Sequence, residues 1–233
     1  AIKGSTASSL ANKPNVLSAA SRCLSEALCR RDVAASVECI DKENSYWRIK
    51  YQLPQQTPLV TILIPTKDRI DLLEKCLTSI QRTTDYSNIE IIVLDNNSQE
   101  RDSLRYFRKL QQEPDINVIR VPGEFNYSRL NNIGTKVAKG ELLLLLNNDI
   151  EAIEKGWFEE MVSQVLRPEI SCVGAKLLYP DETIQHAGVI GLSVGAGHAF
   201  RNTDNRSKIN SGALNLVRNY SAVTAACLMV RKE

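Results

Sequence analysis

The sequence lacks the features that mark several large classes of protein. Its leucine run Leu142–Leu146 is far shorter than the about 20 apolar residues that a membrane-spanning helix needs, and no other run approaches that length. The formal net charge is only +2, without the basic excess typical of nucleic-acid binding. No sustained apolar stretch follows the first ten residues, as a secretory signal would require. We therefore expect no nucleic-acid partner, membrane span or secretory signal.

The six cysteines contain no C-x-x-C pair, and a chain of 233 residues can bury a core without disulfide bonds. This pattern favours reduced thiols in a cytoplasmic protein. We also consider a location at the inner face of the cell membrane, with the protein associated peripherally. The sequence does not begin with methionine. We expect it to be a piece of a longer parent chain with other domains.

The segment 1–56 differs in pattern from the rest of the chain. Apolar residues at helical spacing predict an amphipathic helix over residues 14–31, and residues 46–51 alternate like a short strand. Two prolines mark residues 53–58 as a linker. We expect a helical and linker extension over 1–56 and a main domain over 57–233.

After Pro58 the sequence alternates between strand and helix patterns. Apolar, strand-like runs occupy residues 59–64, 89–94, 116–121 and 142–146. Helical faces lie between them, and Gly140 is expected to end the third helix as its C′ residue. Continuous apolar strands alternating with helices predict an α/β fold with a parallel sheet covered on both faces.

Polar clusters follow three of these strands, at Thr66–Arg69, Asp95–Ser98 and Asn147–Asp149. In parallel sheets ligands bind at the carboxyl ends of the strands, so the three clusters together predict a binding site. Any one of them could instead be a turn or helix cap, and Asp68 and Ser98 suit an N-cap. Asp149 is the ligand type that Mg²⁺ takes together with substrate phosphates, although it could equally cap the next helix.

The phosphate-binding motifs of common nucleotide sites are absent. There is no G-x-x-x-x-G-K-[ST], and no G-x-G-x-x-G follows the first strand. A simple NAD or ATP site is therefore not expected. A nucleotide diphosphate could still bind if a divalent cation shielded its charge.

The polar clusters, in this order, resemble the serial motifs of family 2 glycosyltransferases. The motifs that carry the resemblance are Pro65–Arg69, Asp95–Ser98, Asn131–Gly134 and Leu146–Asp149. Three later stretches are similar to the rhamnosyltransferase-like branch of bacterial surface polysaccharide synthesis: Gly174–Asp181, Ile184–Gly188 and Ala222–Arg231. The resemblance implies the GT-A fold, a Rossmann-like, mostly parallel nucleotide-binding sheet with helices on both faces. The acceptor half would be truncated here.

By this resemblance Asp95 would accept a hydrogen bond from the nucleotide base, and Asn131 stands where many relatives carry arginine. Asn147 replaces the first aspartate of the metal-binding Asp-x-Asp, so Asp149 would hold Mg²⁺ or Mn²⁺ alone and more weakly. The full set implied to bind the nucleotide sugar is Pro65, Thr66, Arg69, Asp95, Asn97, Asn131, Asn147 and Asn148.

The implied activity is metal-dependent, inverting transfer of a sugar from a nucleotide-diphosphate sugar to a saccharide or lipid-linked saccharide acceptor. The catalytic base is expected beyond Glu233, because Asp181 and Glu182 match a turn after Pro180. The alternative is a non-catalytic glycosyltransferase-like binding module, which Asn147 and the missing acidic motif favour. A nucleotidyltransferase would carry a glycine-rich loop after the first strand, and this chain has none there.

Three further groups of aromatic and histidine residues could be structural or could belong to the site. Phe125–Ser128 could supply a ring and an amide near the donor, or could form a hydrophobic staple with Ser128 as N-cap of the third helix. Trp157 and Phe158 are expected on the core face of a helix. His186 and His198 are expected to be structural hydrogen-bonding residues, with a pocket-shaping role as the alternative.

Overall fold

The structure is a computed structural model that describes residues 15–193, 195–207, 212 and 214–232. The chain forms two compact units. We call the larger one the sheet unit, comprising Leu53–Lys176 and Ala222–Glu233, and the other the hairpin unit, comprising Ala1–Gln52 and Leu177–Ser221. No helix among the described residues is long and apolar enough to cross a membrane.

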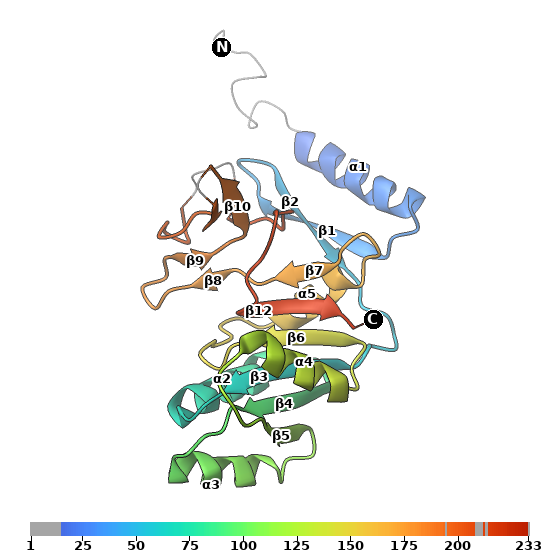
Figure 1. The fold of residues 1–233 in the computed structure, drawn as a ribbon. Coiled ribbons are helices and arrows are strands. Elements are labelled where there is room, and N and C mark those ends of the chain that lie inside the picture. The colour runs from blue at the N-terminus through green and yellow to red at the C-terminus, as the bar shows by residue number, and fades with distance from the viewer. Residues whose placement is uncertain (1–14, 194, 208–211, 213, 233) are drawn as a thin grey trace. The chain divides into compact units, whose positions relative to one another are not determined.

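The sheet unit is built on a six-stranded sheet in the order β5-β4-β3-β6-β12-β7 (Figure 1). Its first four strands run parallel, and β12 pairs antiparallel with both β6 and β7. The strands are β3 (Val60–Thr66), β4 (Ile89–Asp95), β5 (Ile116–Arg120), β6 (Leu142–Leu146), β7 (Cys172–Gly174) and β12 (Cys227–Arg231). The helices are α2 (Ile70–Thr83), α3 (Arg101–Leu110), α4 (Tyr127–Val137) and α5 (Trp157–Val165). The predicted α/β class with a mostly parallel sheet is confirmed.

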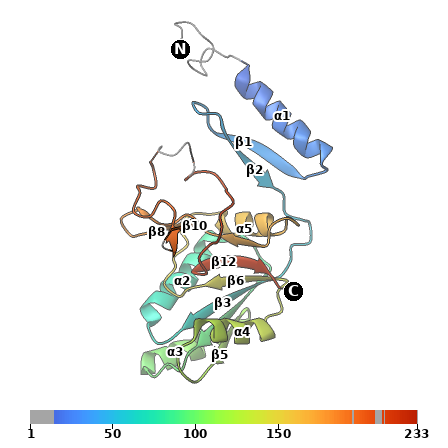
Figure 2. The ribbon, with the colours of Figure 1, turned by 45° about the horizontal axis from the view of Figure 1, so that its top comes forward.

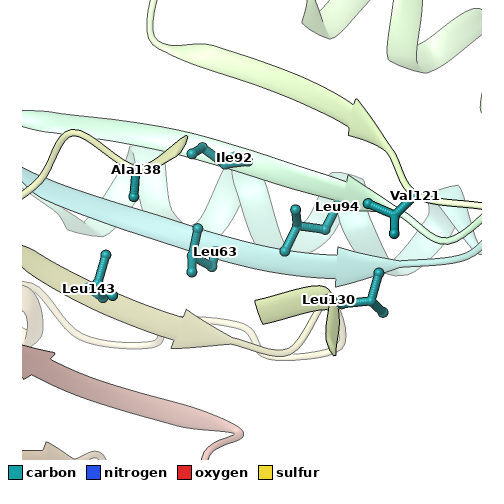
Figure 3. Close-up of a cluster of buried hydrophobic side chains, with 7 residues drawn as sticks. All are labelled: Leu63, Ile92, Leu94, Val121, Leu130, Ala138 and Leu143. Atoms are coloured by element: carbon teal, nitrogen blue, oxygen red, sulfur yellow. The ribbon is translucent and has the colours of Figure 1, made fainter. Parts of the chain in front are cut away.

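Helix α4 packs on one face of the sheet, against β3 and β4. Leu63 of β3 and Leu94 of β4 lie in one buried cluster with Leu130 of α4 (Figure 3). Gly134 permits this close approach, because a Cβ there would lie 2.9 Å from a methyl carbon of Leu63. The alternate β3 residues Ile62 and Ile64 are equally buried and point to the opposite face, so both faces of the sheet are covered.

Helices α2 and α5 are neighbours. Trp157 at the start of α5 donates a hydrogen bond through Nε1 to Oγ1 of Thr83 at the end of α2, at 3.1 Å. Phe158 is fully buried and packs its ring edge-on against Trp157. The prediction that these two aromatic residues belong to a core helix face is confirmed. Along its length α5 lies against β7 and β12 (Figure 2).

The hairpin unit contains the predicted amphipathic helix as α1 (Val16–Arg30) and the predicted strand as β2 (Tyr46–Tyr51). The interpretation of residues 1–56 as helix and linker is nevertheless incomplete, because β2 pairs antiparallel with a second strand, β1 (Ala35–Asp41). Two further hairpins pair β8 (Leu177–Leu178) with β9 (Ile184–His186), and β10 (Val189–Leu192) with β11 (Gly195–His198).

The predicted cap at Gly140 is wrong, and so is the N-cap at Ser128 that one of the two interpretations of Phe125–Ser128 included. Gly140 does not end α4 as a left-handed C′ residue, since its φ is not positive. Glycine is required at position 140 for another reason: the chain there passes very close to β3. A Cβ at Gly140 would lie 2.6 Å from the backbone nitrogen of Thr61. At the other end of α4 the N-cap is Asn126 rather than Ser128, because Oδ1 of Asn126 accepts a hydrogen bond from the backbone N–H of Arg129 at 2.9 Å.

Arg231, the last residue of β12, stabilises the end of α5. Its Nη1 donates to the backbone oxygens of Val165, Arg167 and Ile170 at 2.9, 3.2 and 2.7 Å. Val165 is the last residue of α5, so its carbonyl has no acceptor role within the helix, and a cation there is favoured by the helix dipole. The oxygen of Arg167 also accepts from the backbone N–H of Ile170 at 3.0 Å. We predict that Arg231→Met lowers the free energy of unfolding by about 2 kcal/mol. Urea unfolding measures this, with the exposed Arg82→Met as control; equal small losses in both would contradict the prediction.

The two histidines contact each other in the hairpin unit, as expected of structural residues. Nδ1 of the buried His186 lies 2.8 Å from Nδ1 of the exposed His198. Burial, and then the charge of His198, lower the pKa of His186 from 6.5 to about 4.

A pH dependence of stability follows from this pKa. Because the lower value belongs to the folded state, the unfolded chain takes up the proton first as the pH falls. The contribution of His186 is therefore complete above about pH 6.5 and is lost between pH 6.5 and about 4. Thermal unfolding at a series of pH values should show this loss, and His186→Gln should flatten the curve in that window. An unchanged slope in the variant would contradict the assignment.

Candidate functional site

The three predicted polar clusters meet at the carboxyl edge of the sheet. Thr66, the last residue of β3, is paired with Asp95, the last residue of β4. On its other side β3 pairs in parallel with β6, which ends directly before Asn147. Nδ2 of Asn148 donates to Oγ1 of Thr66 at 3.0 Å. The predicted convergence of these loops at one edge is therefore confirmed.

The loops after β3 and β4 are hydrogen-bonded to each other. The backbone N–H of Asp68 donates to Oγ of Ser98 at 2.7 Å. In return Oδ1 of Asp68 accepts from the backbone N–H groups of Gln99 and Glu100, at 2.9 and 3.0 Å. Asp68 thus fixes the turn that leads into α3. The alternative interpretation of Asp68 as a local N-cap is wrong, because the N-cap position of α2 is Arg69. Burial alone would raise the pKa of Asp68, but these two backbone donors lower it below its usual value.

The same loops hold residues in strained backbone conformations. Asp68, Arg69 and Asn97 have positive φ values of 51°, 48° and 62°. Residues other than glycine adopt this region only where surrounding contacts fix them, and such residues gather at functional sites. The cross-loop hydrogen bonds of Asp68 provide such contacts.

Asp95 is 2% exposed, and both of its carboxylate oxygens are engaged. Oδ1 accepts from the backbone N–H of Ser98 at 2.7 Å, and Oδ2 lies 3.5 Å from Nη1 of Arg120. Nη2 of Arg120 also donates to Oδ1 of Asn97 and to the backbone oxygen of Ser98, at 2.8 and 3.0 Å. Asp95 and Arg120 together therefore fix the turn after β4. Sequence reasoning missed Arg120, which lies 25 residues away at the end of β5.

Asn96 lies in the predicted polar cluster Asp95–Ser98, but sequence reasoning assigned it no binding role. It is 1% exposed, and its Nδ2 donates to the backbone oxygens of Val121 and Gly123, at 3.2 and 3.1 Å. Its Oδ1 is buried without a hydrogen-bond partner in the described part of the chain. A buried acceptor without a donor is unfavourable, so Asn96 can accept an N–H or O–H from a ligand.

Asn131 presents a similar acceptor on α4. It is 5% exposed, its Nδ2 donates to the backbone oxygen of Tyr127 at 2.9 Å, and its Oδ1 has no partner among the described residues. The hydroxyl of Tyr127 donates to the backbone oxygen of Ala225 at 2.8 Å. The segment before β12 therefore also lies at this edge of the sheet. The residue after Ala225, Ala226, accepts a hydrogen bond through its backbone oxygen from the backbone N–H of Asn147 at 2.9 Å.

Asp149 follows β6 in an exposed turn. None of the described residues forms a hydrogen bond or an ion pair with its carboxylate. Burial, together with the negative charges of Asp149 and Glu151, raises the pKa of the Cys76 thiol to about 12. No group of three His, Cys, Asp or Glu that could hold a metal occurs in the described residues. The edge therefore suits a hard cation that one protein carboxylate and the oxygens of a bound ligand would hold. It does not suit a cation surrounded by protein ligands alone.

Two predicted residues have limited roles in this arrangement. The exposed guanidinium of Arg69 donates from Nε and Nη2 to both oxygens of Asp71, at 2.9 and 2.8 Å. To bind a phosphate, the guanidinium of Arg69 would have to share its hydrogen bonds with Asp71 or break them. Pro65 is buried in β3, so its contribution to a ligand is through the position of the strand end.

The acidic residues after Pro180 form a turn in the hairpin unit. Oδ1 of Asp181 accepts from the backbone N–H and the hydroxyl of Thr183, at 3.0 and 2.7 Å. These hydrogen bonds lower the pKa of Asp181. Glu182 is paired with Arg206. The prediction that this stretch is a turn is confirmed.

The fold is an α/β protein with a polar edge at the carboxyl ends of its parallel strands, which is where ligands bind in folds of this kind. The profile of glycosyl transferase family 2 matches residues 61–222, which is well over half of the chain. The chain therefore belongs to glycosyl transferase family 2, as the serial motifs predicted.

Two relatives resemble the chain over most of its length. A protein named y4gI from Sinorhizobium fredii is 40% identical over 235 residues, covering 100% of this chain and 26% of that protein. The O-antigen biosynthesis protein RfbC of Myxococcus xanthus is 39% identical over 216 residues, covering 91% of this chain and 16% of RfbC. The chain thus spans about a quarter or less of the length of these two relatives. Among solved structures, mannosyltransferase PcManGT from Pyrobaculum calidifontis has a TM-score of 0.48 at 22% identity, covering 56% of this chain and 38% of that chain.

Proposed function

We propose that the carboxyl edge of the sheet binds a nucleotide-diphosphate sugar together with Mg²⁺ or Mn²⁺. The protein would transfer the sugar, with inversion, to a saccharide or lipid-linked saccharide acceptor in cell-surface polysaccharide synthesis. Membership of glycosyl transferase family 2 supports the reaction class. The name of RfbC, an O-antigen biosynthesis protein, supports the process. A cytoplasmic location, with or without peripheral association with the membrane, is part of this proposal.

Each group of the donor has a suitable partner at the edge. The free acceptors of Asn96 and Asn131 suit N–H and O–H groups of the base, ribose or sugar. Asp149 would hold the cation, which when bound stabilises negative charge on the leaving diphosphate. Asn147 and Asn148 would offer neutral contacts beside it. The strained turn at Asn97, which Arg120 and Asp95 hold, would keep this surface in place before the donor arrives.

The observation that carries this proposal is the exposed carboxylate of Asp149, which has no partner among the described residues and follows Asn148, whose amide is bonded to the end of β3. Calorimetric titration with UDP, GDP and dTDP, with and without Mn²⁺, tests it. We expect at least one of them to bind, and to bind more tightly with the metal. Absence of binding by all three in the presence of Mn²⁺ would overturn the proposal.

A non-catalytic binding module remains the second candidate. The observation that favours it is Asn147, which removes one carboxylate from the metal-binding motif of the family. Donor hydrolysis separates the two functions: a transferase releases free sugar slowly from its bound donor, whereas a binding module retains the donor intact.

A further inference from the structure

Phe125 is an exposed aromatic residue on the loop between β5 and α4. Its exposed fraction is 67%, although burying a phenylalanine side chain normally stabilises a fold. In the sheet unit the other large apolar residues exposed to a comparable degree are Ile153 and Val137, at 67% and 47%. Of these three, only Phe125 carries a ring.

The loop that carries Phe125 is fixed on both sides of the ring. Before it, the backbone oxygens of Pro122 and Gly123 accept hydrogen bonds from Nη2 of Arg129 and Nδ2 of Asn96, at 3.0 and 3.1 Å. After it, Asn126 caps α4. The exposure of Phe125 is therefore imposed by the fold of its loop, because both neighbouring backbone segments are tied down.

The loop also lies directly beside the unpartnered acceptor of Asn96. The amide of Asn96 is bonded to Val121 and Gly123, at the start of this loop, and its Oδ1 is left without a donor. Val121 lies beside Leu94 and Leu130, where β4 and β5 end (Figure 3). An exposed ring and a buried acceptor at one strand end fit a flat, aromatic ligand that has an N–H group in its plane. A nucleobase has both properties.

We propose that the ring of Phe125 stacks on the base of the bound nucleotide and so determines how tightly the base-bearing part of the donor is held. This inference rests on the proposed function of the same edge. It assigns the base to the side of the site at β4 and β5. The diphosphate is then left for the side at β6, where Asp149 lies.

Calorimetry on four variants tests the stacking, with UDP or whichever diphosphate the wild type binds, in the presence of Mn²⁺. Phe125→Ala and Phe125→Leu should each weaken nucleotide binding by about fivefold or more, the usual effect of losing one base–aromatic stack. Phe125→Tyr should bind as the wild type does. Val137→Ala, at the far end of α4, removes a similarly exposed apolar side chain and should change nothing.

Two comparisons separate stacking from other roles of the ring. Pyrophosphate with Mn²⁺ has no base, so its affinity should be the same in the wild type and in Phe125→Ala. Equal weakening of nucleotide and pyrophosphate would overturn the proposal, as would full nucleotide affinity in Phe125→Leu. If the wild type itself binds no nucleotide, the proposed function fails. If it binds and Phe125→Ala binds equally well, only the assignment of Phe125 fails.

Discussion

Replacing Asp149 by asparagine should abolish the metal dependence of nucleotide binding. The affinity for the nucleotide diphosphate in Mn²⁺ should fall to the value that the wild type shows without metal. The reason is that Asn147 has already replaced the other carboxylate of the motif, so Asp149 is the one acidic side chain there that can hold the cation. Hard divalent cations bind carboxylate oxygens far better than amide oxygens. Titration with and without Mn²⁺ measures the effect directly.

The control for this variant lies in the same loop. Glu151→Gln removes one negative charge two residues away, from another exposed side chain whose charge also reaches Cys76. It should leave the metal dependence intact. If both variants weakened binding equally, Asp149 would act through the general charge of the loop and not as a ligand. Thermal unfolding of Asp149→Asn should match the wild type, because the side chain is exposed and makes no hydrogen bond or ion pair with the described residues.

The arrangement of the sheet could be predicted because its signals are local. Four continuous apolar runs alternate with helical faces, and that rhythm alone indicates parallel strands whose carboxyl ends share an edge. The strands after Leu146 could not be predicted in this way. β7 has only three residues, and most of the chain between β7 and β12, Leu177–Ser221, belongs to the other unit.

The details of the site depend on contacts between residues far apart in the chain. Asp68 looks like a local helix cap, but it holds the turn before α3, 31 residues away, because β3 and β4 are paired in one particular register. The same pairing, continued to β5, places Arg120 beside Asp95 and leaves the acceptor of Asn96 without a partner. Nothing in the sequence around Asn96 distinguishes it from Asn97. Only the burial of its amide reveals the difference.

This network also changes what a substitution at Asp95 is expected to do. The family resemblance implies a contact of Asp95 with the base, whereas in the structure its oxygens are already bonded to Ser98 and Arg120. Asp95→Ala would leave the buried N–H of Ser98 without an acceptor and Arg120 without its carboxylate. We expect a loss of about 3 kcal/mol in the free energy of unfolding, because groups left unpaired in the interior are strongly unfavourable. Nucleotide binding should weaken as well, by about tenfold.

A double-mutant cycle distinguishes a positioning role of Asp95 from a direct contact with the base. Asp95→Asn keeps an oxygen for the N–H of Ser98 but removes the charge that faces Arg120. If Asp95 acts by fixing the turn, Asp95→Asn and Arg120→Met should each weaken nucleotide binding, and the double variant should be no weaker than either. If Asp95 contacts the base independently of Arg120, the two effects should add. Because Arg120 holds Asn97 and Ser98 as well as Asp95, we expect the non-additive result.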